Sequence, residues 1–484
     1  MEKVLHTLNT KLIAANKHQD LINKYKTLCT DEERIVFTLN VMLEYNIIPQ
    51  ACGDMKDAKE SEKLREQGNK LFVSTPLKNY TCVDALKLYT KSIAYAPYPS
   101  EQLAVAYANR SAVLINEKLN NTKNNLYNEE YGRHIVATRK IRPGEVIAVE
   151  KPYSLILTPD NIHTHCSNCL EVSWANIPCE HCTYAMYCSE ECKVMEWKKY
   201  HDVECAVFPS MLKMNFVKLD LFSLRLAIQA AREATNIQEL RKELKEVDSC
   251  FSKDGTFPSD KYRSLLGLVT NTEKRSVQDL FRRSLDASFI LYFVATCTNM
   301  FGNPLSKDLS VLIKNADVTF FGGLILRHQQ LIPSNIHSEC GLEAVERGVA
   351  AMPFCSLINH SCNPNILRHS RSKYIVIYLY DIYTQHYAIT PKAMRQKKLL
   401  KQYYFKCNCL PCQEDWHVLR KFNRYVNIAT EGNISDKHIV DDLLKMIEVL
   451  YELVPMPCEE MNNVVETLKR VYDLNGNRLE IPEL

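Results

Sequence analysis

Residues 166–205 read CSNCLEVSWANIPCEHCTYAMYCSEECKVMEWKKYHDVEC. Seven cysteines and one histidine of this stretch fall into four pairs, which are Cys166/Cys169, Cys179/Cys182, Cys188/Cys192 and His201/Cys205. Two pairs have CxxC spacing, which brings two sulfur atoms within reach of one ion on a tight turn. The other two have a gap of four, which places both side chains on one helical face. Because four soft ligands make a closed tetrahedral zinc site, eight ligands predict two such sites.

A segment this short cannot bury a core of its own, so we expect metal binding to supply much of its folding energy. A disulfide cluster or buried structural cysteines would be the alternative, but spacing this regular favours zinc. A closed zinc site has no open coordination position. The stretch is therefore expected to act as a scaffold or docking surface, with any chemistry located elsewhere in the chain.

The composition sets limits on the rest of the protein. The 484 residues include 19 cysteines, 46% hydrophobic residues and 24% charged residues, and the net charge is +3. Sizeable cores are therefore expected, while the weak charge does not indicate direct nucleic-acid or membrane binding. The first 20 residues lack a signal-peptide apolar core, and no apolar run is long enough to span a membrane. Many cysteines without a secretory signal predict a reducing compartment, so cytoplasm and nucleus are the expected locations.

The N-terminal part is predicted to be helical. Residues 1–61 carry no motif, and residues 62–117 show helical periodicity typical of tetratricopeptide (TPR) repeats. The small, aromatic and terminating positions of such a repeat are occupied by Gly68, Tyr80, Ala85, Tyr89 and Pro97. A repeat and a half cannot bury a continuous repeat core. Either helices of residues 1–60 pack on it, or the array is truncated. Residues 118–131 are polar and are predicted to be a linker.

The hydrophobic period changes after the predicted linker. GRHIVATRKIRPGEVIAVEKPYSLIL, which begins at Gly132, alternates apolar and polar residues and contains a Pro-Gly turn, which predicts a β-meander. Beyond the cysteine-rich stretch, residues 211–330 are mostly helical in pattern, with LRLAIQAAREA as the clearest amphipathic piece. Residues 413–484 are again predicted to form helices.

Two further stretches carry chemical information. LINHSCNPN occupies residues 357–365, and QYYFKCNCLPC occupies residues 402–412. The second stretch supplies three metal ligands in a CxCxxC pattern, at Cys407, Cys409 and Cys412. A closed zinc site needs a fourth ligand, and Cys362 of the first stretch is the candidate. The alternative is three cysteines in a polar loop without a metal. With zinc, the two stretches would be tied together and the chain would hold three ions.

The cysteine-rich stretch resembles the MYND zinc finger, both in its YCSEEC run at Tyr187–Cys192 and in its closing HxxxC. That family binds two zinc ions in an interleaved fashion. The resemblance implies that one ion is held by Cys166, Cys169, Cys188 and Cys192. It implies that the other is held by Cys179, Cys182, His201 and Cys205. Interleaving would cross-link the segment, so that neither site forms alone.

LINHSCNPN and QYYFKCNCLPC resemble the SET domain and its cysteine-rich post-SET tail, and Gly132–Arg133 with the PGE turn matches the start of that domain. A MYND finger inside a split SET domain is typical of the SET-and-MYND-domain (SMYD) family of protein-lysine methyltransferases, and TPR helices mark one subgroup. The resemblance implies an α+β multidomain protein with TPR-like helices, a split β-rich SET domain, an inserted MYND finger, a post-SET segment and a helical C-terminal region. The expected order is helical segment 1–61, TPR-like helices 62–117, linker 118–131, SET first part 132–165, MYND finger 166–205, helical insert 206–330, SET core 331–400, post-SET 401–416 and helical region 417–484.

The reaction implied by this resemblance is transfer of a methyl group from S-adenosylmethionine (SAM) to the amine of a protein lysine. Tyr403 would lie next to the transferred methyl, and Tyr383 would be the second tyrosine of the lysine channel. The resemblance implies cofactor contacts from Gly132, Arg133, His134, Asn335, Asn359, His360, Tyr403 and Phe405. Catalysis of this kind rests mainly on alignment and electrostatics.

Two departures from the family pattern weaken this expectation. His134 stands where most SET domains have a second glycine, which is a mild change. Residues 366–383 contain no glycine, whereas the family has strands and a GEE-type turn there, so the interval looks shortened and would anchor Tyr383 poorly. We expect a shortened isoform or an incomplete gene model. This leaves open a second function, a catalytically weak or silent zinc-stapled adaptor that recruits partners through its MYND and TPR surfaces.

The expected partners are proteins. The substrate would be a histone or non-histone protein that carries a target lysine, and the MYND finger could bind peptides. Arg65, Asn69 and Asn109 match three positions of the carboxylate clamp with which some TPR domains hold a chaperone's acidic C-terminus. The clamp's other basic residues would lie on helices that this chain lacks, so we expect weak or absent chaperone binding.

Overall fold

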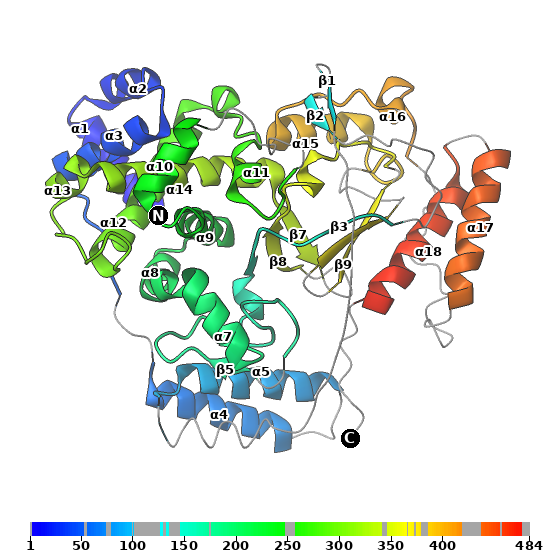
Figure 1. The fold of residues 1–484 in the computed structure, drawn as a ribbon, viewed down its shortest axis with the longest axis horizontal. Coiled ribbons are helices and arrows are strands. Elements are labelled where there is room, and N and C mark those ends of the chain that lie inside the picture. The colour runs from blue at the N-terminus through cyan, green and yellow to red at the C-terminus, as the bar shows by residue number, and fades with distance from the viewer. Residues whose placement is uncertain are drawn as a thin grey trace.

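The computed structural model describes most of the chain, and the folded regions are drawn in Figure 1. The described residues are 2–52, 56–73, 79–98, 100, 126–128, 132–134, 146–173, 176–246, 257–340, 346–364, 366–371, 374–378, 386–418, 437–454 and 457–476. Helices predominate over strands in these regions. No helix among the described residues is both long and apolar enough to cross a bilayer.

The N-terminal segment forms three helices, which are α1 (Glu2–Ala14), α2 (His18–Lys26) and α3 (Asp31–Glu44). A capping box starts α3: the Glu33 N–H donates to Thr30 Oγ1 at 3.1 Å, and the Thr30 N–H donates to the Glu33 carboxylate at 2.8 Å. Ile35, Leu39 and Met42 recur along one face of α3 and are fully buried. This face belongs to the main hydrophobic core of the molecule.

The partners of α3 come from the middle of the chain. The helices there are α8 (Asp202–Lys213), α9 (Lys218–Glu233), α10 (Ile237–Glu246), α11 (Tyr262–Leu266), α12 (Val277–Cys297), α13 (Leu309–Lys314) and α14 (Ala316–Asn335). Helix α3 packs on α12 and α14, so α1–α3 and α8–α14 share one core, here called the helical body (Figure 1). The N-terminal segment is therefore part of the helical body, and within the described residues the apolar face of α3 is buried there and not against the helices predicted to be TPR-like.

A glycine pair in α14 permits this close packing. A Cβ atom added to Gly322 would lie 2.9 Å from Ile35 Cγ2, and one added to Gly323 would lie 3.2 Å from the backbone nitrogen of Glu32. Only glycine leaves room for α3 at this crossing without displacing its neighbours.

Two antiparallel three-stranded sheets form the strand region. The strands are β3 (Val146–Glu150), β4 (Ser154–Leu157), β7 (His337–Cys340), β8 (Glu346–Ala351), β9 (Leu367–Arg371) and β10 (Tyr374–Tyr378). Their orders are β3-β10-β9 and β4-β8-β7. A separate strand pair joins β1 (Leu126–Asn128) to β2 (Gly132–His134). The end of the predicted linker 118–131 is therefore a strand, because its Leu126–Asn128 backbone pairs with β2.

The interval that looked shortened in the sequence contains two paired strands. Strand β9 pairs with β10, with Arg371 opposite Tyr374, and β10 pairs with β3, with Val376 opposite Val149. The sequence led us to expect poor anchoring of the segment that follows this interval. The backbone nevertheless forms both strands, because the hydrogen bonds of the ladder do not require a glycine. Tyr383 itself lies outside the described residues.

Helices α4 (Ala58–Val73) and α5 (Asn79–Tyr95) form a hairpin in which Gly68 faces the ring of Tyr89. This hairpin lies against residues 166–205, here called the cysteine-rich finger (Figure 1). Ile93 and Ala94 of α5 pack with Leu170 and Met186 of the finger. The further helix predicted for the TPR-like array, residues 100–116, lies outside the described residues except for Ser100.

The finger and the C-terminal part complete the fold. Their elements are β5 (Ile177–Pro178), β6 (Met186–Tyr187), α7 (Glu190–Glu196), the π-helical turn η2 (Trp197–His201), α15 (Lys392–Tyr403), α16 (Leu410–Gln413), α17 (Lys437–Leu453) and α18 (Glu459–Gly476). Short 3-10 turns occur at η1 (Pro159–Asn161), η3 (Thr272–Lys274) and η5 (Cys355–Leu357). Helix α18 attaches to the rest through Asn462, whose amide donates to Tyr387 Oη at 2.7 Å.

Candidate metal centres and cofactor site

Three groups of four side chains bring their ligand atoms together within the described part of the chain. In each group the atoms all lie within 4.8 Å of one another. The first set is Cys166, Cys169, Cys188 and Cys192; the second set is Cys179, Cys182, His201 and Cys205; the third set is Cys362, Cys407, Cys409 and Cys412. The structure thus brings together the twelve residues expected from the sequence, in the interleaved arrangement that the MYND resemblance implied.

The spacing within these sets fits zinc. The sulfur atoms of Cys169 and Cys188 are 3.7 Å apart, and those of Cys179 and Cys205 are 3.8 Å apart. Four thiolates about 2.3 Å from one zinc ion lie about 3.8 Å from each other in a tetrahedron. A disulfide would bring two sulfur atoms to about 2.05 Å, so these cysteines are thiols in metal-ligand geometry and are not oxidised pairs.

Local structure explains how the finger presents its ligands. Ser189 caps α7 by accepting from the Cys192 N–H at 3.3 Å, which fixes the turn between Cys188 and Cys192. The π-helical turn η2 then carries His201 into the second set, where its Nε2 lies 3.4 Å from Cys179 Sγ and 3.5 Å from Cys182 Sγ. A π-helical turn inserts one extra residue and is often found at functional positions.

The third set joins two segments that are 45 residues or more apart in the chain. The Cys362 N–H donates to Cys409 Sγ at 3.4 Å, and the sulfur atoms of Cys362 and Cys412 are 3.6 Å apart. Gln396 of α15 holds the second segment in place, since its amide donates to the Cys407 carbonyl at 2.7 Å and accepts from the Cys407 N–H at 3.0 Å. The residues after α15 are therefore fixed against the loop that carries Cys362.

An aromatic cluster lies beside this junction. The ring centroids of His360 and Phe405 are 5.9 Å apart, and those of Tyr403 and Phe405 are 6.5 Å apart. Tyr404 adopts a left-handed conformation with φ of 61° and so turns the chain at the end of α15. Burial lowers the pKa of His360 to about 4, so its imidazole is neutral near pH 7, and burial raises the pKa of Tyr403.

A buried carboxylate supports the loop that leads to His360. Glu150, at the end of β3, is only 3% exposed. Its two oxygens accept from the N–H groups of Phe354 and Cys355, each at 2.8 Å. Sequence reasoning missed Glu150. The available signal was an acidic residue at the end of an otherwise apolar strand, where burial demands hydrogen-bond partners.

The other predicted cofactor residues lie on three separate segments of the structure. Asn359 is exposed at the start of the His360 loop. The Asn335 amide donates to the carbonyls of Val269 and Leu331, each at 2.7 Å, so its donors are engaged by backbone. The backbone of Gly132, Arg133 and His134 forms β2. The roles of all these residues remain predictions.

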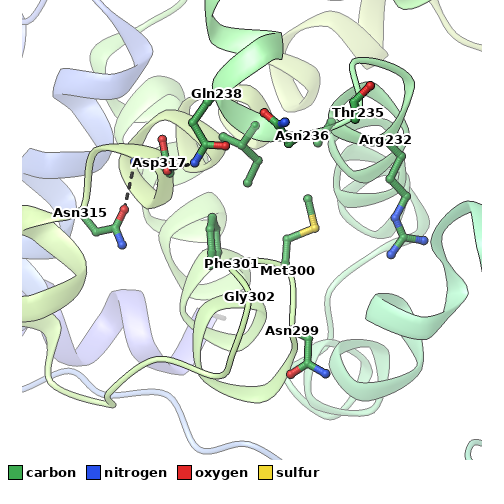
Figure 2. Close-up of a pocket in the computed structure, with 12 residues that line it drawn as sticks. Arg232, Thr235, Asn236, Gln238, Asn299, Met300, Phe301, Gly302, Asn315 and Asp317 are labelled. Atoms are coloured by element: carbon green, nitrogen blue, oxygen red, sulfur yellow. Dashed lines mark hydrogen bonds between the residues drawn. The ribbon is translucent and has the colours of Figure 1, made fainter.

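A cavity of about 440 Å³ lies elsewhere, in the helical body (Figure 2). Figure 2 shows amide and charged side chains around it, among them Gln238 and Asp317, which hydrogen-bond to each other. Arg232 is paired with Asp202 at 2.7 Å. None of the lining residues belongs to the zinc sets or to the aromatic cluster.

Comparison with known proteins agrees with this geometry. Residues 166–205 match the MYND finger family model. Protein-lysine N-methyltransferase SMYD4 of Mus musculus is 25% identical over 365 residues, covering 59% of this chain and 45% of the relative. Histone-lysine N-methyltransferase ASHR1 of Arabidopsis thaliana is 25% identical over 291 residues, covering 58% of this chain and 53% of the relative. Histone-lysine N-methyltransferase SMYD3 of Mus musculus is 23% identical over 370 residues, covering 72% of this chain and 74% of the relative.

The cysteine-rich finger thus defines the chain as a MYND-finger protein with two interleaved ligand sets. The finger and the similarity to relatives named as lysine methyltransferases in animals and plants support a relationship to the SMYD family. The chain spans about half the length of the SMYD4 relatives that it matches, 45% in the mouse protein.

Proposed function

We propose that this protein is a SAM-dependent protein-lysine N-methyltransferase. The observation that carries the proposal is the third ligand set, because Cys362 fastens its loop to the segment that contains Tyr403 and Phe405. In the family that this chain resembles, the two corresponding segments form the cofactor site together. Here their aromatic side chains already lie side by side.

Three described residues at the candidate cofactor site support SAM binding. Phe405 is 36% exposed and can stack on a purine, and Asn359 is exposed on the loop that carries His360. His360 is held neutral and partly buried between Phe405 and the third set. When bound, SAM would supply an electrophilic methyl group on a sulfonium. The residues present fit that cofactor, and Gly132–His134 of β2 are proposed to complete the site.

The protein's own contribution would be to position the substrate lysine and keep it uncharged. An amine must lose its proton before it can attack, and a poorly solvated aromatic environment lowers an amine's pKa. We assign this environment to Tyr403, whose own phenol is shielded enough to have a raised pKa, together with Tyr383. The remaining effect would be alignment, in which an error of roughly 1 Å can cost about 10²-fold in rate.

The decisive experiment measures cofactor binding and methyl transfer separately. Isothermal calorimetry should detect SAM binding to the full chain, weakened at least tenfold by Asn359→Ala. A tritiated-methyl assay on lysate proteins should detect transfer that Tyr403→Phe greatly reduces without a comparable loss of binding. Lys242→Ala, at an exposed position on α10, is the matched control. Absence of SAM binding in a protein that holds three zinc ions would refute the proposal.

A second candidate function is favoured by Asn335. Its amide donors are already engaged by Val269 and Leu331, so a cofactor contact through those donors would require them to be released. In an adaptor, the zinc-stapled fold would instead display the finger and α4–α5 to partners. SAM binding without transfer to any lysate protein would favour that function.

The finer architecture also belongs to this proposal. We propose that the strand region with β2 is a split SET domain, that residues 401–416 are its post-SET segment, and that α4–α5 are TPR-like. A protein substrate, peptide ligands of the finger, and residence in cytoplasm and nucleus are proposed with it. Weak or absent chaperone binding at α4–α5 is part of the same proposal, and Arg65 of the expected clamp forms an ion pair with Glu62 of the same helix.

A further inference from the structure

A buried ion pair lies directly behind the second ligand set. The Arg225 guanidinium of α9 donates twice to the Glu204 carboxylate of α8, from Nε to Oε1 at 2.7 Å and from Nη2 to Oε2 at 2.6 Å. The Arg225 side chain is 4% exposed and that of Glu204 is fully buried. Two parallel charge-assisted hydrogen bonds of this kind fix both side chains in one orientation.

Arg225 also makes contacts to three other parts of the protein. Its Nη1 donates to the Leu155 carbonyl on β4 at 2.8 Å, and its Nη2 lies 3.2 Å from Glu196 Oε1 of α7. Its Cζ lies 3.9 Å from the ring centroid of Tyr200 in η2. One side chain of the helical body therefore holds the finger's helix, the π-helical turn and a strand.

Glu204 faces the side of His201 that points away from the thiols. Nε2 of His201 lies among the sulfur atoms of the second set, while Nδ1 lies 3.9 Å from Glu204 Oε2. That separation is beyond hydrogen-bond range, so the effect on the ring is electrostatic. Glu204 also directly precedes Cys205, the last ligand of the set. Fixing Glu204 therefore fixes the helical turn that carries both His201 and Cys205.

We propose that Glu204 and Arg225 are positioning residues for the second zinc ion, which is thereby held by the helical body as well as by the finger. Carboxylates hydrogen-bonded to the far nitrogen of a ligating histidine raise its basicity as a ligand, and losing them typically costs about 10–100-fold in metal affinity or activity. Glu204 acts at longer range through its charge, so we expect an effect at the lower end of that range. Here Glu204 is held by Arg225, and Arg225 is held by Leu155. Metal retention at the second set would thus depend on a residue of α9 that lies well beyond the last ligand in the sequence.

The two ligand sets of the finger differ in exposure and in ligand type, so the release of their ions can be compared within one protein. The first set contains the exposed Cys188, and the Lys193–Glu180 ion pair beside it, at 2.7 Å, is partly exposed. The second set is the only one of the three described sets that contains a histidine. After replacement of zinc by ¹¹³Cd, the second set should give a resonance distinct from the two all-cysteine sets. Loss of each ion can then be followed separately in the intact protein.

The test compares metal release from the full-length protein and its variants under a fixed excess of chelator. Glu204→Gln should accelerate loss of the second ion about tenfold and leave the other two unchanged. Arg225→Met should act in the same direction. Glu204→Asp, which keeps the charge but shortens the side chain, should give a smaller acceleration. The matched control is Asp202→Asn, which breaks the Asp202–Arg232 pair at 2.7 Å between the same two helices, with both side chains about one-third exposed.

The outcomes separate a positioning role from a merely structural one. Selective acceleration at the second set by Glu204→Gln, with Asp202→Asn unchanged, supports the proposal. Equal acceleration of all three ions would show that the variant only loosens the fold, and wild-type release by Glu204→Gln would show that Glu204 does not act on the metal; either result overturns it. If Glu204→Gln does not fold, Glu204→Asp gives the same comparison. None of these readouts depends on methyl transfer.

Discussion

Glu150 and Phe354 are joined by a hydrogen bond of 2.8 Å, from the Phe354 backbone N–H to the Glu150 carboxylate, and Cys355 donates to the other oxygen at the same distance. One buried side chain on β3 therefore fixes the chain just before the His360 loop. Because the carboxylate is buried, its two hydrogen bonds cannot be replaced by water without opening the structure.

Glu150→Gln is the first prediction. The amide keeps one acceptor but sets its NH₂ group against a backbone N–H, which should destabilise the fold by about 2–3 kcal/mol. SAM affinity should fall with it, because the loop that carries Asn359 and His360 loses its support. Thermal unfolding and calorimetry measure the two effects. Glu44→Gln, at a side chain 54% exposed, should change neither; an unaltered SAM affinity in Glu150→Gln would contradict the supporting role.

The second prediction concerns the third ligand set. Cys362→Ser removes the only ligand of this set that comes from the His360 loop, so the protein should lose one of three zinc equivalents and bind SAM more weakly. Elemental analysis of purified protein counts the metal. Cys29→Ser alters an exposed cysteine outside all three sets and should retain three equivalents. Two or fewer ions in the wild-type protein would count against the third site.

The third prediction concerns pH. Burial raises the pKa of Asp286 to about 7, the nearby Asp220 carboxylate acts in the same direction, and Arg282 and Arg283 oppose it. Between the ordinary pKa of 3.8 and about 7 the folded state therefore holds this proton more tightly than the unfolded state. The free energy of unfolding should fall as pH rises through this window, with no further loss from this group above it.

Asp286→Asn should remove that dependence. At pH 8 the variant should be more stable than the wild type by about 2 kcal/mol, because it no longer buries a charge. The difference should vanish or reverse near pH 4. Urea unfolding at several pH values measures this, with Asp442→Asn at a side chain 75% exposed as control. A constant difference across the pH range would disprove the assignment.

The fourth prediction tests the crossing of α3 and α14. Gly322→Ala should destabilise by about 1–3 kcal/mol, although alanine favours helix by roughly 1 kcal/mol, because the added methyl would lie 2.7 Å from Leu291 Cδ2 and 2.9 Å from Ile35 Cγ2. The N-terminal helices should then be cleaved faster in limited proteolysis. Lys314→Ala, at an exposed position on α13, should leave the cleavage rate of these helices unchanged. A more stable Gly322→Ala protein would show that α3 can shift without cost.

The ligand sets could be predicted from sequence because their information is local. CxxC pairs and pairs four residues apart fix the positions of two ligands within one turn of the chain. The resemblance to the MYND finger supplied the assignment of the pairs to two interleaved ions. The packing of α3 could not be predicted in this way. Thr38 hydrogen-bonds to Ser288 at 2.7 Å, 250 residues further along the chain, and nothing in the period of either helix identifies the other. An apolar face predicts that a helix is buried, but it does not identify the element on which the helix packs.

The pairing of β9 with β10 shows a different limit. The interval looked shortened because it lacks the family's GEE-type turn, and the structure shows that β10 within it pairs with both β9 and β3. The poor anchoring of Tyr383 stays a prediction, because that residue lies outside the described residues. Arg225 and Glu150 were missed for a related reason. Each acts through a backbone group or side chain brought close only by tertiary folding.

The packing of α3 on α12 and α14 also delays the burial of α3 during synthesis. Residues of α3 leave the ribosome roughly 250 positions before Ser288, their partner in the core. At a translation rate of about 5–20 residues per second, Ile35 and Leu39 wait about 12–50 s without the surface that buries them. A nascent chain of this protein is therefore an aggregation-prone species for much of its synthesis, and its yield should depend on chaperones that shield the first three helices until α14 has emerged.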